Sequence, residues 1–380
     1  MVNPLRRAVA LAVPILLAFA PSADGAVEPD GAMAGAACAS SFDARGLTSL
    51  FAGDIGRVVG ADYQRAFRLP DGRVLWLFQD AFIRNSPSSV RLVHNIGMVQ
   101  RGRCFRVLRS GTVRNPKPWI GAAATTPERH WFWPLAGLVA GDGTFRLFLA
   151  EMVEHGPRYL SHTEPVATWL ATITLPDLSI TRLRPARNSS GQLYGWSVAG
   201  DDEHTYLYGH CYRQFGWGPF PFGHHPCAAF VKVARVPKGE PNALPSYWNG
   251  RSWSRRPGRA VNIAPLRAPS GERRAVNPMQ IAYTGRCWIA VTKEGDWFGD
   301  TIYLDSARTP TGPWRTTSVI PARPLGEPSV YNTFFASFIR PTTTPRIIGL
   351  SNNRWDGVLS DNYRPTFRGI RARRWSPCGG

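Results

Sequence analysis

A Pro-Asp-Gly turn joins two apolar runs in the segment Ala66-Phe-Arg-Leu-Pro-Asp-Gly-Arg-Val-Leu-Trp-Leu-Phe-Gln-Asp80. An Asp-Gly pair between two such runs is a strong signal for a β-hairpin. The first copy of this pattern spans residues 60–80. The same order of apolar strand, turn and apolar strand with a polar end recurs over 131–151, 194–210, 277–294 and 331–353.

Five such hairpins over most of the chain predict one all-β domain. Further short apolar runs fill the gaps, and we expect strands at Val93 to Arg101, Phe105 to Leu108, Thr168 to Leu175, Phe230 to Val236 and Thr301 to Asp305. The 37 Gly and 33 Pro residues interrupt the chain too often for long helices. A two-sheet sandwich also has short strands and frequent turns. The repetition over the whole length favours a five-bladed β-propeller as a single domain.

The N-terminus has the pattern of an export signal. Two arginines, Arg6 and Arg7, precede an apolar stretch from Ala8 to Ala20, and small residues follow up to Ala26. The apolar stretch is too short to span a membrane, and no later stretch reaches the ~20 apolar residues that a span needs. We therefore expect a signal peptide at 1–26, a flexible leader at 27–47 and the propeller at 48–380. The protein is expected to be secreted or associated with the cell envelope.

Six cysteines remain after the predicted signal, which in an oxidising compartment indicates three disulfides. Cys211 and Cys227 bracket one loop and form the best candidate pair. His210, His224 and His225 lie beside them, so a zinc site is the alternative, but the spacing matches no standard ligand pattern. We predict no metal site and no cofactor, and bound calcium is left open.

The basic charge does not identify a partner. The chain has 45 basic and 26 acidic residues, and all but four of the basic ones are arginine. The arginines are scattered along the chain and no nucleic-acid-binding motif accompanies them, so we expect no nucleic acid as a partner. We expect a monomer. A sialidase would need a central cluster of arginines, and the starts of the blades do not offer one.

In a propeller blade, the start of the first strand and the end of the second lie on the same face. Five hairpins would thus bring carboxylates, amides, an imidazole and indole rings to one opening. These are the groups of a carbohydrate site, because carboxylates do acid–base or nucleophilic work and Trp faces stack on sugar rings. The candidate catalytic residues are Asp62, Asp80 and Glu151. The candidate substrate-binding residues are Trp133, Trp196, His210, Trp217, Asn277, Glu294, Asn332 and Asn353.

Glycoside hydrolysis uses two carboxyl groups, about 5–5.5 Å apart for retention of configuration and about 6.5–9.5 Å for inversion. Asp62 and Asp80 come from one predicted blade and suit a close pair, whereas Glu151 would give a wider one. Asp80 ends an apolar strand, a setting that can raise a carboxyl pKa. The structural alternative for each carboxylate is a turn or cap that bonds backbone amides.

The first hairpin resembles the opening of a family of secreted bacterial propeller domains of long unknown function. The shared elements are the Leu-Pro-Asp-Gly-Arg turn from Leu69, the strand Trp76-Leu-Phe-Gln-Asp80 and the pair His94-Asn95. Ala307-Arg-Thr-Pro-Thr-Gly-Pro-Trp314 is similar to a turn common in five-bladed glycosidases, and the resemblance covers roughly residues 50–374.

Relatives of that family include endo-D-arabinanases. The resemblance implies that Asp62 is the nucleophile or base and that Asp80 is its partner. The family pattern Gly-Gly-Asp is Gly60-Ala-Asp62 in this chain, and Phe-Gly-Asp-Thr is Phe78-Gln-Asp-Ala81. Both aspartates are kept while their neighbours differ.

The leading hypothesis is therefore a secreted glycoside hydrolase that acts on a cell-wall or environmental polysaccharide. Among such polymers, arabinan is the best single guess. The alternative is a non-catalytic carbohydrate-binding propeller of the cell envelope. Under either hypothesis the partner is a polysaccharide or oligosaccharide.

Overall fold

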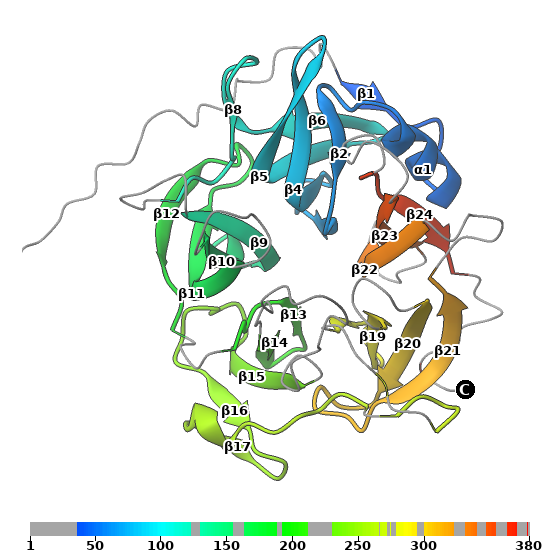
Figure 1. Cartoon of the computed structure of the whole chain (residues 1–380). Coiled ribbons are helices and arrows are strands. Elements are labelled where there is room, and N and C mark those ends of the chain that lie inside the picture. Colours follow the sequence, from blue (N-terminus) through cyan, green and yellow to red (C-terminus); the bar gives the residue numbers. More distant parts are fainter. Residues whose placement is uncertain are drawn as a thin grey trace, which may run out of the picture.

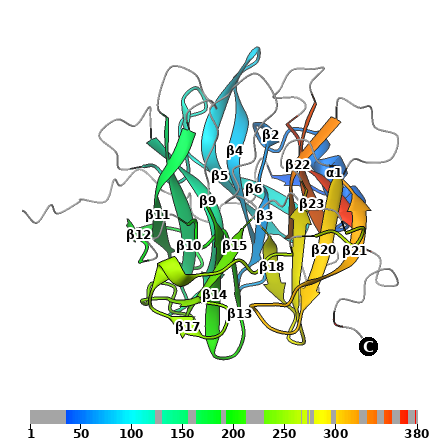
Figure 2. The same ribbon diagram turned by 60° about the horizontal axis from the view of Figure 1, so that its bottom comes forward.

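The computed structural model shows five β-sheets arranged in a ring around a central axis (Figure 1). The strands run roughly along that axis, as the side view shows (Figure 2). The structure describes residues 36–122, 130–154, 163–187, 192–211, 230–265, 267–271, 274, 279–294, 300–322, 331–339, 347–354, 363–370 and 378. The five-bladed propeller predicted from the repeated hairpins is confirmed, and the sandwich alternative is not.

Each blade is an antiparallel sheet whose first strand lies nearest the axis. From the axis outward, blade 1 contains β2 (Val58–Ala61) and β3 (Arg65–Arg68), then β4 (Val74–Ser86), β5 (Ser89–Arg101), β6 (Cys104–Leu108) and β1 (Ala37–Cys38). In the same order, blade 2 contains β9 (His130–Val139), β10 (Phe145–Glu154), β11 (Thr163–Ile173) and β12 (Ile180–Pro185).

The other three blades follow the same plan. Blade 3 contains β13 (Ser197–Gly200), β14 (His204–His210), β15 (Val231–Pro237), β16 (Ser246–Trp248) and β17 (Trp253–Ser254). Blade 4 contains β18 (Gln280–Tyr283), β19 (Trp288–Lys293), β20 (Thr301–Ala307) and β21 (Arg315–Pro321). Blade 5 contains β22 (Tyr331–Ile339), β23 (Ile347–Arg354) and β24 (Thr366–Gly369). The small elements outside the blades are α1 (Ala44–Ala52), β7 (Ser110–Gly111), β8 (Pro116–Lys117) and the 3-10 helix η2 (Pro257–Arg259).

The turn chemistry and the core both follow from the sequence pattern. Gly72 and Gly143, in the inner turns of blades 1 and 2, have φ angles of +83° and +77°, which residues other than glycine rarely adopt.

The buried apolar side chains of the described residues form five clusters, one at each junction between neighbouring blades. Leu77 and Leu147, for example, lie in the cluster between blades 1 and 2. Burial of apolar surface therefore holds the blades to one another around the ring.

The N-terminal segment closes the ring against the last blade. Helix α1 begins after Asp43, whose carboxylate caps the N–H of Gly46 at 2.8 Å. On that helix, the Thr48 hydroxyl accepts a hydrogen bond from the N–H of Phe367 at 2.9 Å. Strand β1 pairs with β6. Residues 36–47, which the sequence assigns to the leader, thus contribute β1 and the start of α1 to the packed structure.

Two disulfides lie within the described residues, Cys38–Cys104 and Cys287–Cys378. Cys211 is also disulfide-bonded, as expected in preference to a zinc ligand, while its expected partner Cys227 lies outside the described residues. Such bonds are typical of oxidising compartments. Among the described residues, no helix has both the length and the apolar character needed to cross a membrane.

Candidate active site

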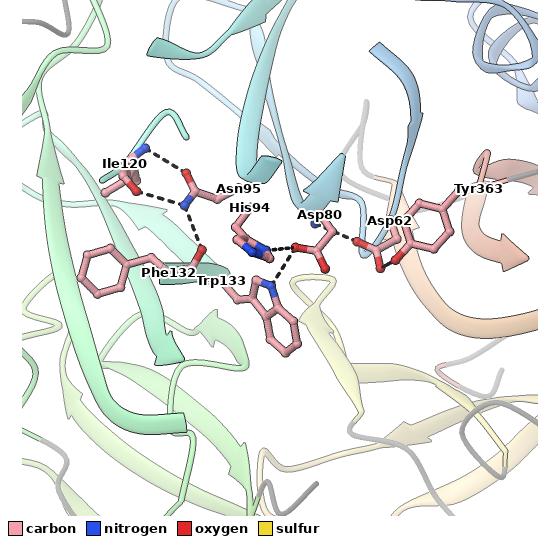
Figure 3. A network of polar contacts seen from close by, with 8 residues as sticks. All are labelled: Asp62, Asp80, His94, Asn95, Ile120, Phe132, Trp133 and Tyr363. Atoms are coloured by element: carbon pink, nitrogen blue, oxygen red, sulfur yellow. Dashed lines mark hydrogen bonds and ion pairs between the residues drawn. The ribbon is translucent and has the colours of Figure 1, made fainter. Parts of the chain in front are cut away.

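The inner strand of blade 1 is interrupted where the first candidate carboxylate lies. Between β2 and β3, Tyr63 has a φ angle of +48°, which departs from strand geometry. The ladder to β4 nevertheless continues. The N–H of Asp62 donates to the carbonyl of Asp80 at 3.0 Å, and the N–H of Gln79 donates to the carbonyl of Asp62 at 3.2 Å. Asp62 and Asp80 are therefore neighbours across two adjacent strands, as the one-blade prediction requires (Figure 3).

The Asp62 carboxyl group is buried, and both of its oxygens accept hydrogen bonds. Oδ1 accepts from the backbone N–H of Asp80 at 2.9 Å, and Oδ2 accepts from the Tyr363 hydroxyl. Burial, and then the nearby charge of Asp80, raise the pKa of Asp62 well above its ordinary value, against the opposing effect of the Tyr363 hydrogen bond. Asp62 therefore favours its protonated form more strongly than an exposed aspartate does.

The Asp80 carboxylate joins blade 1 to blade 2. Its Oδ1 accepts from the indole Nε1 of Trp133 at 3.0 Å and lies 2.8 Å from Nδ1 of His94 (Figure 3). The Asp80 side chain is 8% exposed and the His94 side chain 22%. Asp80 thus fixes the orientation of an imidazole that reaches solvent, in the manner of a carboxylate that orients a catalytic histidine.

His94 is held from both sides. Its ring stacks on Trp131 with centroids 4.3 Å apart. The next residue, Asn95, has a φ of +48° and bonds three backbone groups of the neighbouring segment. Its amide Nδ2 donates to the carbonyls of Ile120 at 3.0 Å and Phe132 at 2.8 Å, and its Oδ1 accepts from the N–H of Ile120 at 2.9 Å. The His-Asn motif thus consists of a site residue and the residue that positions it.

Glu151 belongs to a second network on blade 2. Its Oε1 lies 3.2 Å from Nδ1 of His130, and its Oε2 accepts from the indole of Trp169 at 2.7 Å. The Glu151 side chain is 16% exposed and that of His130 is 26% exposed. Trp131, which stacks on His94, follows His130 on β9. The two networks therefore involve consecutive residues of that strand. The third candidate carboxylate is therefore more accessible than either aspartate.

The centre of the ring holds a buried cation that the sequence-based site omits. The Arg65 guanidinium donates to the carbonyl of Pro134 at 3.1 Å and lies over the rings of Trp196 and Phe335, at 4.7 Å and 5.1 Å from their centroids. Burial lowers the pKa of Arg65 to about 9. The edge of Trp196 packs on His210, and burial, with the Arg65 charge as the lesser cause, lowers the pKa of that histidine to about 3. His210 is therefore neutral at physiological pH.

The structure describes the side chains of only some of the remaining predicted residues. Glu294 accepts a hydrogen bond from the Tyr303 hydroxyl at 3.2 Å at the end of β19. Asn332 and Asn353 pair with each other across β22 and β23, and their side chains are outside the described part of the structure. Trp217 and Asn277 also lie outside the described residues. Trp133 and Trp196 lie in the wall of the centre, where both are buried.

Several residues of this candidate site were not among the predicted ones, including His94, Tyr363 and Arg65. His94 was visible only as part of the His-Asn motif, Tyr363 follows the last hairpin, and Arg65 lies within an inner strand. The described part of the chain holds no group of three or more His, Cys, Asp or Glu side chains arranged to bind a metal ion.

Comparison with solved structures supports the fold. A crystal structure of a putative hydrolase from Bacteroides ovatus has 18% sequence identity and a TM-score of 0.63, and the match covers 82% of this chain and 85% of that one. A GH43 endo-arabinanase from Bacillus licheniformis has 10% identity, a TM-score of 0.45 and coverage of 83% and 97%. A xylan β-1,4-xylosidase from Bacillus halodurans has 12% identity, a TM-score of 0.48 and coverage of 85% and 55%. At 18% identity the first likeness shows the fold alone, and the other two, with TM-scores below 0.5, add nothing to it.

No curated protein matches the chain. A family model does match, and it covers the last four residues of α1 and all of the five blades except β1. Because it spans residues 49–375, the chain belongs to the family described as a domain of unknown function, DUF5005.

Proposed function

We propose that this protein is a secreted glycoside hydrolase that cleaves a cell-wall or environmental polysaccharide, with arabinan as the best single substrate. The observation that supports this most is the pair of neighbouring carboxyl groups of Asp62 and Asp80 at the wall of the ring centre. Their surroundings differ, since Asp62 is buried with a raised pKa while Asp80 bonds to a partly exposed histidine. Carboxyl pairs in unequal surroundings are typical of acid–base catalysis.

We assign the roles from exposure and from hydrogen bonds. Asp80 is the carboxylate that acts on the sugar or on the attacking water, because Asp62 is the more deeply buried of the two. Asp62 holds a proton next to the Asp80 carboxylate. Glu151, with His130, lies nearest to solvent and is the candidate proton donor to the leaving oxygen. In the net reaction, water adds across the glycosidic bond, one product taking a proton and the other a hydroxyl group.

Digestion of arabinogalactan and lipoarabinomannan, followed as new reducing ends, tests the proposal. Asp80→Asn is expected to lower the rate by roughly 10²-fold or more, the usual scale for loss of an acid or base. Asp177→Asn is the matched control, because that aspartate is an exposed turn residue that bonds Thr174 and Ser179. Cleavage that persists at the wild-type rate in both Asp62→Asn and Asp80→Asn would rule out this site.

A non-catalytic carbohydrate-binding propeller is the second candidate. One observation favours it: Asp62 and Asp80 are only 3% and 6% exposed, which limits their contact with a substrate. Under this hypothesis a glycan binds and no reducing ends form. Equilibrium binding to the same polymers, measured on the wild type in parallel with digestion, separates the two functions.

A further inference from the structure

A cavity of about 520 Å³ lies between blades 2 and 3, at the opposite end of β9 and β10 from His130 and Glu151. It is bounded by the turn between β9 and β10, by β12 and by the segment after β15. Such a volume is within the range of small-molecule pockets. The cavity is therefore separate from the acidic pair, and the proposed hydrolase function does not use it.

Among the charged side chains that line this cavity, the cationic ones outnumber the acidic ones. Four basic residues and two acidic ones contribute to its wall: Arg146, Arg184, Arg187, Lys238, Asp142 and Glu240. One acidic charge is already paired, because Asp142 forms an ion pair with Arg146. Lys238 lies 3.4 Å from Asp202 in an exposed pair, which contributes little in water. The wall therefore retains an excess of positive charge.

Arg184 lies among other positive charges and is held by a neutral side chain. In the amide orientation that satisfies both groups, the Asn242 oxygen accepts from its two terminal nitrogens at 3.0 and 3.2 Å. This acceptor is neutral, so it orients the guanidinium without cancelling its charge. Burial lowers the pKa of Arg184, and three neighbouring positive charges lower it further. Those charges belong to Arg182, Arg146 and Arg187.

Arg187 has no ion-pair partner in the described part of the chain and is exposed at the edge of the cavity. Guanidinium groups present a planar fork of N–H donors that matches the oxygens of carboxylate and phosphate groups. Crowded arginines without carboxylate partners are stabilised when an anion enters between them. The volume leaves room for a sugar unit that carries the anion.

We propose that this cavity binds an oxyanion group, a phosphate or a carboxylate, carried on a carbohydrate. Arg184, held by Asn242, and Arg187 are the recognising residues. Because the cavity lies away from the acidic pair, such binding anchors a charged glycan without taking part in its cleavage. The oxyanion follows from the donors alone, whereas its carbohydrate carrier rests on the proposed function.

Isothermal titration calorimetry of the full chain at low ionic strength tests this, with inorganic phosphate, trigalacturonate and neutral galactotriose as probes. The wild type should bind at least one of the two anionic probes, and galactotriose at least ten-fold more weakly. Whichever anion binds more tightly identifies the natural source of the charge. The double variant Arg184→Ala/Arg187→Ala should bind the anion at least ten-fold more weakly. Arg184→Lys, which keeps the charge without the fork, should fall between the two.

The control is Arg286→Ala/Arg308→Ala, which removes two exposed positive charges from turns of blade 4. It should bind like the wild type, because those turns do not line the cavity. An equal loss in this control would show that net charge alone attracts the probes and would overturn the proposal. The proposal would also be overturned if Arg184→Ala/Arg187→Ala bound the anion as tightly as the wild type does. The same holds if the wild type bound galactotriose as tightly as it binds the anionic probes. Thermal unfolding of each variant confirms that it is folded.

Discussion

Replacement of Asn95 tests how the candidate site is held in place. This side chain is 2% exposed and makes three hydrogen bonds to the backbone of Ile120 and Phe132. It also occupies a left-handed backbone conformation, with φ at +48°. Asn95→Ala removes the hydrogen bonds and leaves three buried backbone groups without that partner. It also leaves alanine in a left-handed conformation that glycine and asparagine adopt more readily.

The expected cost follows from these contacts. Three hydrogen bonds at about 1 kcal/mol each give about 3 kcal/mol, and the left-handed conformation adds about 1 kcal/mol for alanine. Asn95→Ala should thus lower the free energy of unfolding by about 4 kcal/mol. Asn95→Gly loses the same hydrogen bonds without the backbone cost and should lower it by about 3 kcal/mol. The difference between the two variants isolates the backbone contribution.

Urea unfolding followed by tryptophan fluorescence gives both values. The same variants, tested on a glycan substrate below their unfolding midpoints, report on the geometry of the candidate site, because Asn95 fixes the backbone next to His94. A loss below 1 kcal/mol for Asn95→Ala would show that the blade junction does not depend on this side chain. Equal losses for the alanine and glycine variants would contradict the backbone part of the reasoning.

Three further changes have expected outcomes that urea unfolding can check. Trp133→Phe keeps an aromatic ring and removes the N–H donor to Asp80, so the free energy of unfolding should fall by about 2 kcal/mol. An unchanged free energy of unfolding would show that this hydrogen bond does not stabilise the fold. The double variant Cys38→Ser/Cys104→Ser removes a disulfide between residues 66 positions apart. On the chain-entropy model of disulfides, the free energy of unfolding should fall by about 4 kcal/mol. The pKa of His210 falls from 6.5 to about 3 on folding, so its contribution to stability is complete above pH 6.5 and is lost as pH falls toward 3. His210→Gln should therefore lose less stability than the wild type between pH 7 and pH 4.

The fold could be predicted because its decisive signals are local. A short turn between two apolar runs is a local hairpin signal, strongest where the turn is Asp-Gly, and five such hairpins in sequence leave few ways to bury their apolar faces. The closure of the ring could not be read in the same way. Thr48 and Phe367 are 319 positions apart, and their contact depends on where the last blade ends. The helix α1 is short, and nothing in its sequence indicates the sheet on which it packs.

The site was predicted in part for the same reason. Asp62 and Asp80 are brought together by one hairpin, so their proximity follows from strand pairing. Tyr363 reaches Asp62 from the opposite end of the chain, and only the closed ring brings the two together. Trp133 was expected to stack on a sugar, but its indole N–H bonds Asp80, because a buried indole needs an acceptor.

Arg65 shows why burial, more than sequence, decides the chemistry at the centre. The sequence does not distinguish Arg65 from the many other arginines of the chain. In the structure it is 3% exposed and contacts residues of three other blades. Its charge favours the ionised form of Asp62 and disfavours protonation of His210. A single buried cation thus partly offsets the cost of placing two carboxyl groups side by side, while it keeps the nearby imidazole neutral. The charge of Arg65 therefore acts electrostatically on both of these groups.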